Sequence, residues 1–153
     1  LIIHTAPSGM PRLAIMMYEH TALCLQFAHA FGNGEFEPLA PAQQMIHVVS
    51  HHDVGWFDFD RDPKIDPATG LPYDLVETPP EFITVTSRLS PEFNQHQHPY
   101  CGLISSMHSW GLFNARYGYS QFRVRKGGST SVPIPDEAKD QGHSMLDGEV
   151  ARQ

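Results

Sequence analysis

The feature that most constrains this chain is the placement of three histidines within predicted helices. Helix-favouring composition and the positions of proline and glycine predict helices over residues 19–31, 41–57 and 99–113. In each helix, apolar residues recur every three or four positions, and one histidine lies on that apolar stripe. The stripes are His20 with Leu23, Phe27, Ala30 and Phe31; His52 with Met45, Val48, Val49 and Trp56; and His108 with Ile104, Gly111 and Leu112. We therefore expect these histidines to face the core of a helical fold.

Buried side chains of this kind need polar partners. Asp53, one position after His52, also falls on the core side of its helix. An ionisable group buried without a partner costs several kcal/mol of lost hydration. A divalent metal removes this cost, because it binds neutral imidazole and carboxylate together. The pattern predicts a shared polar site of His20, His52, Asp53 and His108. The alternative for each histidine taken singly is a hydrogen-bonded core residue.

The remaining segments predict a mainly helical single domain over all 153 residues. Short apolar runs around a turn rich in Pro and Gly predict a β-hairpin over residues 1–17. Residues 58–80 alternate Asp with Pro and predict a long irregular segment, either a lid or a long turn. A short helix over 81–90 should end at Pro91. Residues 135–153 are weakly helical, and we expect a truncated or disordered tail there.

Charge and cysteine content exclude several classes of protein. The formal net charge is −7, so we expect no nucleic-acid binding through a basic surface. No apolar run approaches the roughly 18 residues of a membrane-spanning helix. No secretory signal is visible, although the first residue is Leu1 rather than Met. Cys24 and Cys101 form no disulfide framework, so we expect both in the core of a protein from a reducing, cytoplasmic compartment.

The segment Ser50-His51-His52-Asp53-Val54-Gly55-Trp56 resembles the central motif of the HD superfamily. Proteins of that superfamily carry a His-Asp pair on a helix and an earlier histidine one helix upstream, where this chain has His20. More narrowly, the motifs between about residues 10 and 120 resemble those of a family of uncharacterised bacterial proteins with an HD-like pattern. These motifs are Glu19-His20-Thr21-Ala22, His52-Asp53 with Gly55-Trp56 and Asp60, Asp66-Pro67 with Gly70-Leu71-Pro72, Pro99-Tyr100, and Ser106-Met107-His108 with Gly111-Leu112.

The HD resemblance implies a helical, metal-dependent phosphohydrolase that holds one divalent transition-metal ion, which could be Mn, Fe, Zn or Ni. It implies His20, His52 and Asp53 as ligands, with Asp53 also orienting or deprotonating the attacking water. The superfamily has a late Asp as its fourth ligand, and this chain has no obvious counterpart. His108 is the substitute, as a metal ligand or as a catalytic group that faces the substrate. Further candidates lie near the end of the chain, at Asp136, Asp140 and Asp147.

A group of basic residues follows the third helix and suggests how a substrate is held. The group consists of Arg116, Arg123, Arg125 and Lys126. Because Arg binds phosphate bidentately, we expect Arg116 to bind a small phosphorylated or nucleotide-like substrate. The alternative is a solvated loop. Two other functions stay open: an HD-like di-iron oxygenase, and a binding or structural module without turnover.

Four further histidines and one aspartate have weaker assignments. His47 and His51 are four residues apart on the polar side of their helix and should be an exposed pair. With Asp60, they are the spare ligands that a second iron would need; alternatively, Asp60 supports a ligating histidine. His96 and His98 should cap the helix that begins at Pro99 or reach the rim of a site.

Overall fold

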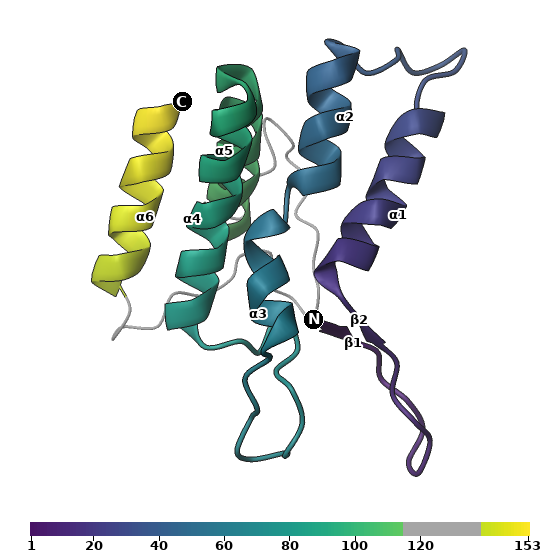
Figure 1. The fold of residues 1–153 in the computed structure, drawn as a ribbon, viewed down its shortest axis with the longest axis vertical. Helices are drawn as coiled ribbons and strands as arrows, with labels where there is room; N and C mark the ends of the chain where they lie inside the picture. The colour runs from purple at the N-terminus through teal and green to yellow at the C-terminus, as the bar shows by residue number, and fades with distance from the viewer. Residues whose placement is uncertain (115–138) are drawn as a thin grey trace.

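The structure is a computed structural model; it describes residues 1–114 and 139–153 and is mainly helical (Figure 1). Two short strands, β1 (Ile2–Ile3) and β2 (Ala14–Ile15), form an antiparallel pair. The longer helices are α1 (Met17–Ala30), α2 (Ala42–His51), α4 (Pro80–Gln97), α5 (Pro99–Asn114) and α6 (Lys139–Arg152). A 3-10 helix, η1 (Val54–Trp56), and the short α3 (Phe57–Arg61) follow α2. The expected helical class and N-terminal hairpin are confirmed. None of the described helices is long and apolar enough to span a membrane.

Helices α4 and α5 form the centre of the fold, with small side chains between them. A Cβ atom added to Gly102 would come within 2.9 Å of the Gln95 Cα, so the two backbones approach closely there. In Figure 1, α6 lies at one edge of the bundle, against α4 and α5, and α1 lies at the other edge, against α2. An apolar cluster of Met17, Trp56 and Ile83 joins α1, η1 and α4.

The helix expected over 41–57 is interrupted after His51, and the reason lies in α4. In a continuous α-helix the carbonyl of His51 would accept a hydrogen bond from the N–H of Gly55. Instead, the Asn94 side-chain amide donates to the His51 carbonyl at 3.0 Å, and the Gly55 N–H donates to Ser90 Oγ at 3.0 Å. The His51 carbonyl and the Gly55 N–H therefore both have hydrogen-bond partners on α4, so the break leaves neither group unsatisfied.

The helix expected to end at Pro91 instead continues to Gln97. Proline has no N–H, so the carbonyl of Ser87 loses its partner within α4. Ser109 of α5 supplies the replacement, since its Oγ donates to the Ser87 oxygen at 3.0 Å. The predicted end of the helix at residue 90 was wrong, because the hydrogen bond that compensates for Pro91 is donated by Ser109 of another helix. The weakly helical pattern near the end of the chain corresponds to α6.

The apolar stripe predicted on α1 is not the face that the helix buries. Leu23, Phe27 and Phe31 are 49%, 66% and 51% exposed. The helix instead buries the adjacent face, which carries Met17, Thr21 and Ala28. Because α1 lies at the edge of the bundle, its packing partners lie on one side only, and periodicity alone does not say which side. His20 lies at the border of the buried face and is partly buried.

The Asp- and Pro-rich segment over 58–80 is tied to the N-terminal hairpin. It begins within α3 and then runs irregularly to α4. The side chain of Asp74 accepts a hydrogen bond from the backbone N–H of Ile3 at 2.8 Å. This contact places Leu75 and Val76 beside the histidines, where they form part of a pocket wall.

Candidate metal centre

Four side chains from separate elements converge between α1, α2 and α5. His20 lies on α1, His52 is the residue that caps the C-terminal end of α2, Asp53 follows it, and His108 lies on α5. The Nε2 atoms of His20 and His52 are 3.3 Å apart. The Asp53 Oδ2 atom lies 3.2 Å from His52 Nε2 and 3.7 Å from His20 Nε2. The His108 ring packs edge-on to the His52 ring, with centroids 5.3 Å apart. The structure thus brings together all four predicted ligands.

Asp53 reaches the cluster by a different route from the one expected. Helical phase predicted its direction, but the residue lies in the turn between α2 and η1, with φ −115° and ψ 21°. The break in the helix turns its carboxylate towards the imidazoles. The side chains of Asn94 and Ser90, which hold both sides of this break, therefore position the His-Asp pair.

The second nitrogen of His52 indicates which tautomer is present. Its Nδ1 atom lies 2.7 Å from the carbonyl oxygen of Val49. A carbonyl can only accept, so Nδ1 carries a proton and Nε2 is the nitrogen available to a metal. A ligating histidine usually has such a contact, which fixes the ring and makes the other nitrogen more basic.

Burial and the Asp53 carboxylate set the charges of the cluster. Burial lowers the pKa of both His20 and His108 below the usual 6.5, against the pull of Asp53. Burial acts in the same direction on His52, but the hydrogen bond and charge of Asp53 outweigh it and raise the pKa of His52. The pKa of Asp53 is lowered because the nearby imidazoles, His52 above all, outweigh its burial. The cluster thus holds an ionised carboxylate, and burial favours the neutral form of His20 and His108 that a metal ligand requires, whereas His52 would release its proton as a metal binds.

The spacing of the donor atoms also fits a metal. With bonds of about 2.0–2.1 Å to nitrogen and oxygen, at angles of about 90–110°, neighbouring ligand atoms are about 2.9–3.4 Å from one another. The three measured separations among His20, His52 and Asp53 are 3.2, 3.3 and 3.7 Å. A second group, His52 with Asp53 and His108, has its donor atoms within 4.8 Å of one another. The residues present therefore fit a divalent ion.

The four side chains of the cluster line a pocket of about 230 Å³. Most of the wall is apolar and comes from η1, α4, α5 and the loop before α4. The apolar wall residues are Trp56, Leu75, Val76, Ile83 and Leu112. His108 and Leu112 line the pocket together, as the shared face predicted for them requires. Such a cavity, apolar with a few converging polar groups, is typical of small-molecule sites.

The comparison with protein families identifies relatives but no activity. A family model described as a protein of unknown function, DUF3891, matches residues 2–153. The chain belongs to the DUF3891 family. No curated protein and no solved structure matches this DUF3891 protein. The family match agrees with the expected resemblance to uncharacterised proteins. It contains no assignment to the HD superfamily, so that relationship stays a prediction.

Several predicted site residues of this DUF3891 protein lie elsewhere or outside the described residues. Asp60 is buried and accepts hydrogen bonds from the backbone nitrogens of Leu1 and Met17, so it fixes the hairpin and the start of α1 rather than a ligating histidine. Asp147 is exposed and belongs to neither group of candidate ligands in the described ranges. The residues outside the described part are Arg116, Arg123, Arg125, Lys126 and Asp136, together with the side chain of Asp140.

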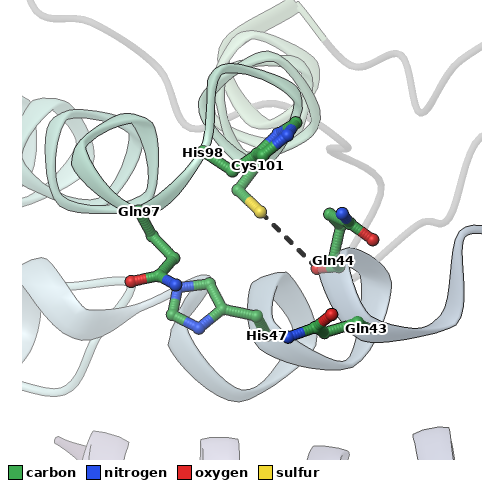
Figure 2. A pocket seen from close by; sticks show the side chains of 6 residues that line it. All are labelled: Gln43, Gln44, His47, Gln97, His98 and Cys101. Atoms are coloured by element: carbon green, nitrogen blue, oxygen red, sulfur yellow. Dashed lines mark hydrogen bonds between the residues drawn. The ribbon is translucent and has the colours of Figure 1, made fainter.

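His47 and His51 are not the exposed pair that their position predicted. Both are partly buried, their rings stack 4.3 Å apart, and both stack on Phe93 of α4. His47 also lines a second pocket, of about 250 Å³, between α2 and the junction of α4 with α5 (Figure 2). Its Nε2 atom is buried there with no hydrogen-bond partner among the described residues.

His98 and Cys101 lie at the other side of this second pocket. His98 Nδ1 accepts a hydrogen bond from the Tyr100 N–H at 3.1 Å, so His98 caps α5 as expected, whereas His96 is exposed. Figure 2 shows the thiol of Cys101 directed at the carbonyl of Gln44, 3.8 Å away. Cys101 is 1% exposed, which confirms its assignment to the core.

Cys24 is partly buried and lies beside the candidate ligands. It was expected in the core, but its Sγ atom lies 3.7 Å from His20 Nε2. Cys24, His20 and His52 form a group whose donor atoms lie within 4.8 Å of one another. Burial, with the nearby Asp53 carboxylate, raises the pKa of the Cys24 thiol. The signal was present in the sequence, since Cys24 lies four residues after His20, on the same face of a helix.

Proposed function

We propose that the chain is a metal-dependent hydrolase that binds one divalent transition-metal ion, Mn, Fe, Zn or Ni, and cleaves a small phosphoester. The ligands in this proposal are His20, His52, Asp53 and His108. The observation that carries it is the convergence of three imidazoles and an ionised carboxylate from α1, the end of α2 and α5, with separations of 3.2–3.7 Å among the donor atoms of His20, His52 and Asp53. The phosphoester substrate comes from the resemblance to the HD superfamily.

Each side chain has a role in this proposal. A bound divalent ion would act as a Lewis acid that acidifies water and polarises a phosphoryl oxygen. The contact of His52 Nδ1 with the Val49 carbonyl fixes the ring and leaves Nε2 as the nitrogen that would hold the ion. Asp53 is ionised, so the oxygen that does not face the ion can orient a water molecule and accept its proton. His108 is kept neutral by burial, which suits a ligand better than a proton donor at neutral pH.

The pocket wall suggests how a substrate would lie. No Lys or Arg lines the pocket among the described residues. The negative charge of a phosphoryl group would then be balanced by the ion, and by Arg116 if that predicted contact forms. Trp56, Leu75 and Leu112 offer an apolar surface for the organic part of the ester. A monoester or diester with an apolar leaving group therefore suits the pocket best.

The described residues favour one ion over the two of an oxygenase. The spare ligands of the oxygenase hypothesis lie apart from the cluster: Asp60 binds backbone nitrogens, and His47 and His51 stack on Phe93. This supports a mononuclear centre.

Elemental analysis of the purified protein tests the proposal, with His52→Ala and His51→Ala as a matched pair. We expect about one equivalent of metal in the wild type and in His51→Ala, and a loss of most of it in His52→Ala. His51 is the control because its Nδ1 lies 2.7 Å from Ser50 Oγ and its ring stacks on Phe93, away from the ion. Equal losses in both variants would contradict the assignment of the ligands.

Activity is then measured on metal-loaded protein with p-nitrophenyl phosphate and bis(p-nitrophenyl) phosphate. Metal-dependent release of nitrophenol from one of them, absent in His52→Ala, is the expected result. Two equivalents of iron would favour the oxygenase. A protein that takes up no metal from Mn, Fe, Zn or Ni salts would refute the hydrolase, and the histidines would then form a hydrogen-bonded network in a binding module.

A further inference from the structure

We propose that the Cys24 thiolate is an additional ligand of the ion in the His20–His52 cluster, and that the site therefore selects a thiophilic ion. This inference rests on the proposed metal centre and narrows it. Of the ions in that proposal, Zn²⁺, Fe²⁺ and Ni²⁺ fit and Mn²⁺ is disfavoured; Mg²⁺ is excluded, and Co²⁺ serves as a spectroscopic substitute. The reason is that thiolate is a soft ligand, whereas Mg²⁺ and Mn²⁺ prefer oxygen donors.

The helical geometry of α1 places the two donors together. His20 and Cys24 are four residues apart and thus lie one above the other on the same helix face. Their donor atoms are 3.7 Å apart, and both lie within 4.8 Å of the His52 donor nitrogen. Because both come from one rigid helix, this separation does not depend on loop conformation.

The separation matches an edge of a coordination polyhedron that includes sulfur. A metal–sulfur bond of about 2.3 Å and a metal–nitrogen bond of about 2.05 Å, at angles of about 90–110°, place the two ligand atoms about 3.1–3.6 Å apart. The Cys24–His20 separation is 3.7 Å, and the His20–His52 separation of 3.3 Å matches the shorter nitrogen–nitrogen edge.

A single ion can use both groups of candidate ligands. The two groups, His20–Cys24–His52 and His52–Asp53–His108, share His52. An imidazole nitrogen has one lone pair, and the other nitrogen of His52 is used on the Val49 carbonyl. The shared nitrogen can therefore bind one ion only, and Cys24 approaches this ion from the α1 side. As the metal–sulfur bond forms, the thiol proton is released to solvent.

The chain supplies a matched control, because it contains two cysteines. Cys101 is buried in a different part of the fold, with its thiol 3.8 Å from the carbonyl of Gln44. Cys24→Ser and Cys101→Ser make the same chemical change, one beside the proposed ion and one away from it.

The test is the absorption spectrum of the full-length protein reconstituted with Co²⁺ alone. Thiolate bound to Co²⁺ gives a charge-transfer band in the near ultraviolet, whereas nitrogen and oxygen ligands give only the visible ligand-field bands. We expect both kinds of band in the wild type and in Cys101→Ser. In Cys24→Ser we expect the visible bands without the near-ultraviolet band.

A chelator competition gives a second readout. Cys24→Ser should weaken Zn²⁺ binding by at least about tenfold, with a much smaller effect on Mn²⁺. Visible bands without a near-ultraviolet band in the wild type would overturn the role of Cys24 and leave the histidine–aspartate site standing. Because this outcome is read from the wild-type protein, it does not depend on whether any variant folds. If the wild type bound no Co²⁺ and gave no visible bands, the proposed metal centre itself would fail.

Discussion

Gly55 lies where the turn after the His-Asp pair packs directly against α4. Adding one methyl group there, as in Gly55→Ala, should push this turn away from α4. A Cβ atom added there would lie 2.1 Å from the backbone oxygen of Thr86, 3.0 Å from Leu89 Cβ and 3.1 Å from the Ser90 nitrogen. The closest of these atoms is backbone, so no side-chain rotation relieves the contact. In Gly55→Ala, the turn that follows the His-Asp pair would have to move away from α4 by about 1.3 Å to reach an ordinary contact distance of about 3.4 Å.

The size of the effect follows from this geometry. Overpacking in a dense interior costs typically about 1–3 kcal/mol, and a backbone clash belongs at the upper end of that range. For a chain of this size, about 3 kcal/mol corresponds to a fall of roughly 6–12 °C in the melting temperature. The same movement exceeds the tolerance of about 0.2 Å in metal–ligand distances, so metal affinity should also fall, by about tenfold or more.

Differential scanning calorimetry and chelator competition measure the two effects, with Gly34→Ala as the control. Nothing lies within 4 Å of a Cβ atom at Gly34, so this variant should melt with the wild type. If Gly55→Ala melted at the wild-type temperature and kept its metal affinity, then α4 would not abut the turn. The account of how the His-Asp pair is positioned would be refuted.

Two further predictions concern α4 and the second pocket. Asn94→Ala removes the amide that bonds the carbonyls of His51 and Ser90, and an unsatisfied buried carbonyl costs about 1–3 kcal/mol. Its free energy of unfolding in urea should fall by that amount and its metal affinity should fall as well; an unchanged free energy of unfolding would contradict the bridging role. Burial and the neighbouring His51 lower the pKa of His47 from 6.5, so the folded state takes up its proton less readily than the unfolded state. His47 therefore destabilises the fold increasingly as the pH falls below 6.5. Compared by urea unfolding, His47→Gln should lose less stability on acidification than the wild type, and parallel pH profiles would refute this.

The sequence predicts the candidate site better than it predicts the helices that carry it. His52 and His108 face the core because α2 and α5 have neighbours on their apolar sides, so periodicity and burial agree. On α1 the hydrophobic periodicity and the observed burial disagree, since Phe27 lies on the apolar stripe and is 66% exposed. A stripe shows which residues a helix can bury, and the position of the helix in the bundle decides which it does bury.

The errors in the helix boundaries have one physical cause. The break after His51 depends on Asn94 and Ser90, and the continuation of α4 through Pro91 depends on Ser109. Each contact joins residues far apart in the chain, and local patterns contain no information about them. Proline and glycine rules describe hydrogen bonds within a segment, and here other helices supply the bonds that were missing.

The end of α2 beside the cluster has an electrostatic consequence for the direction of substrate approach. The peptide dipoles of a helix sum to about half a negative charge at its C-terminal end. In α2 this end lies at His51, immediately before the His-Asp pair. Its field attracts a cation at the cluster, typically by about 0.3–1 kcal/mol. The same field repels a phosphoryl group, so an anionic substrate should approach the ion from the side facing away from α2.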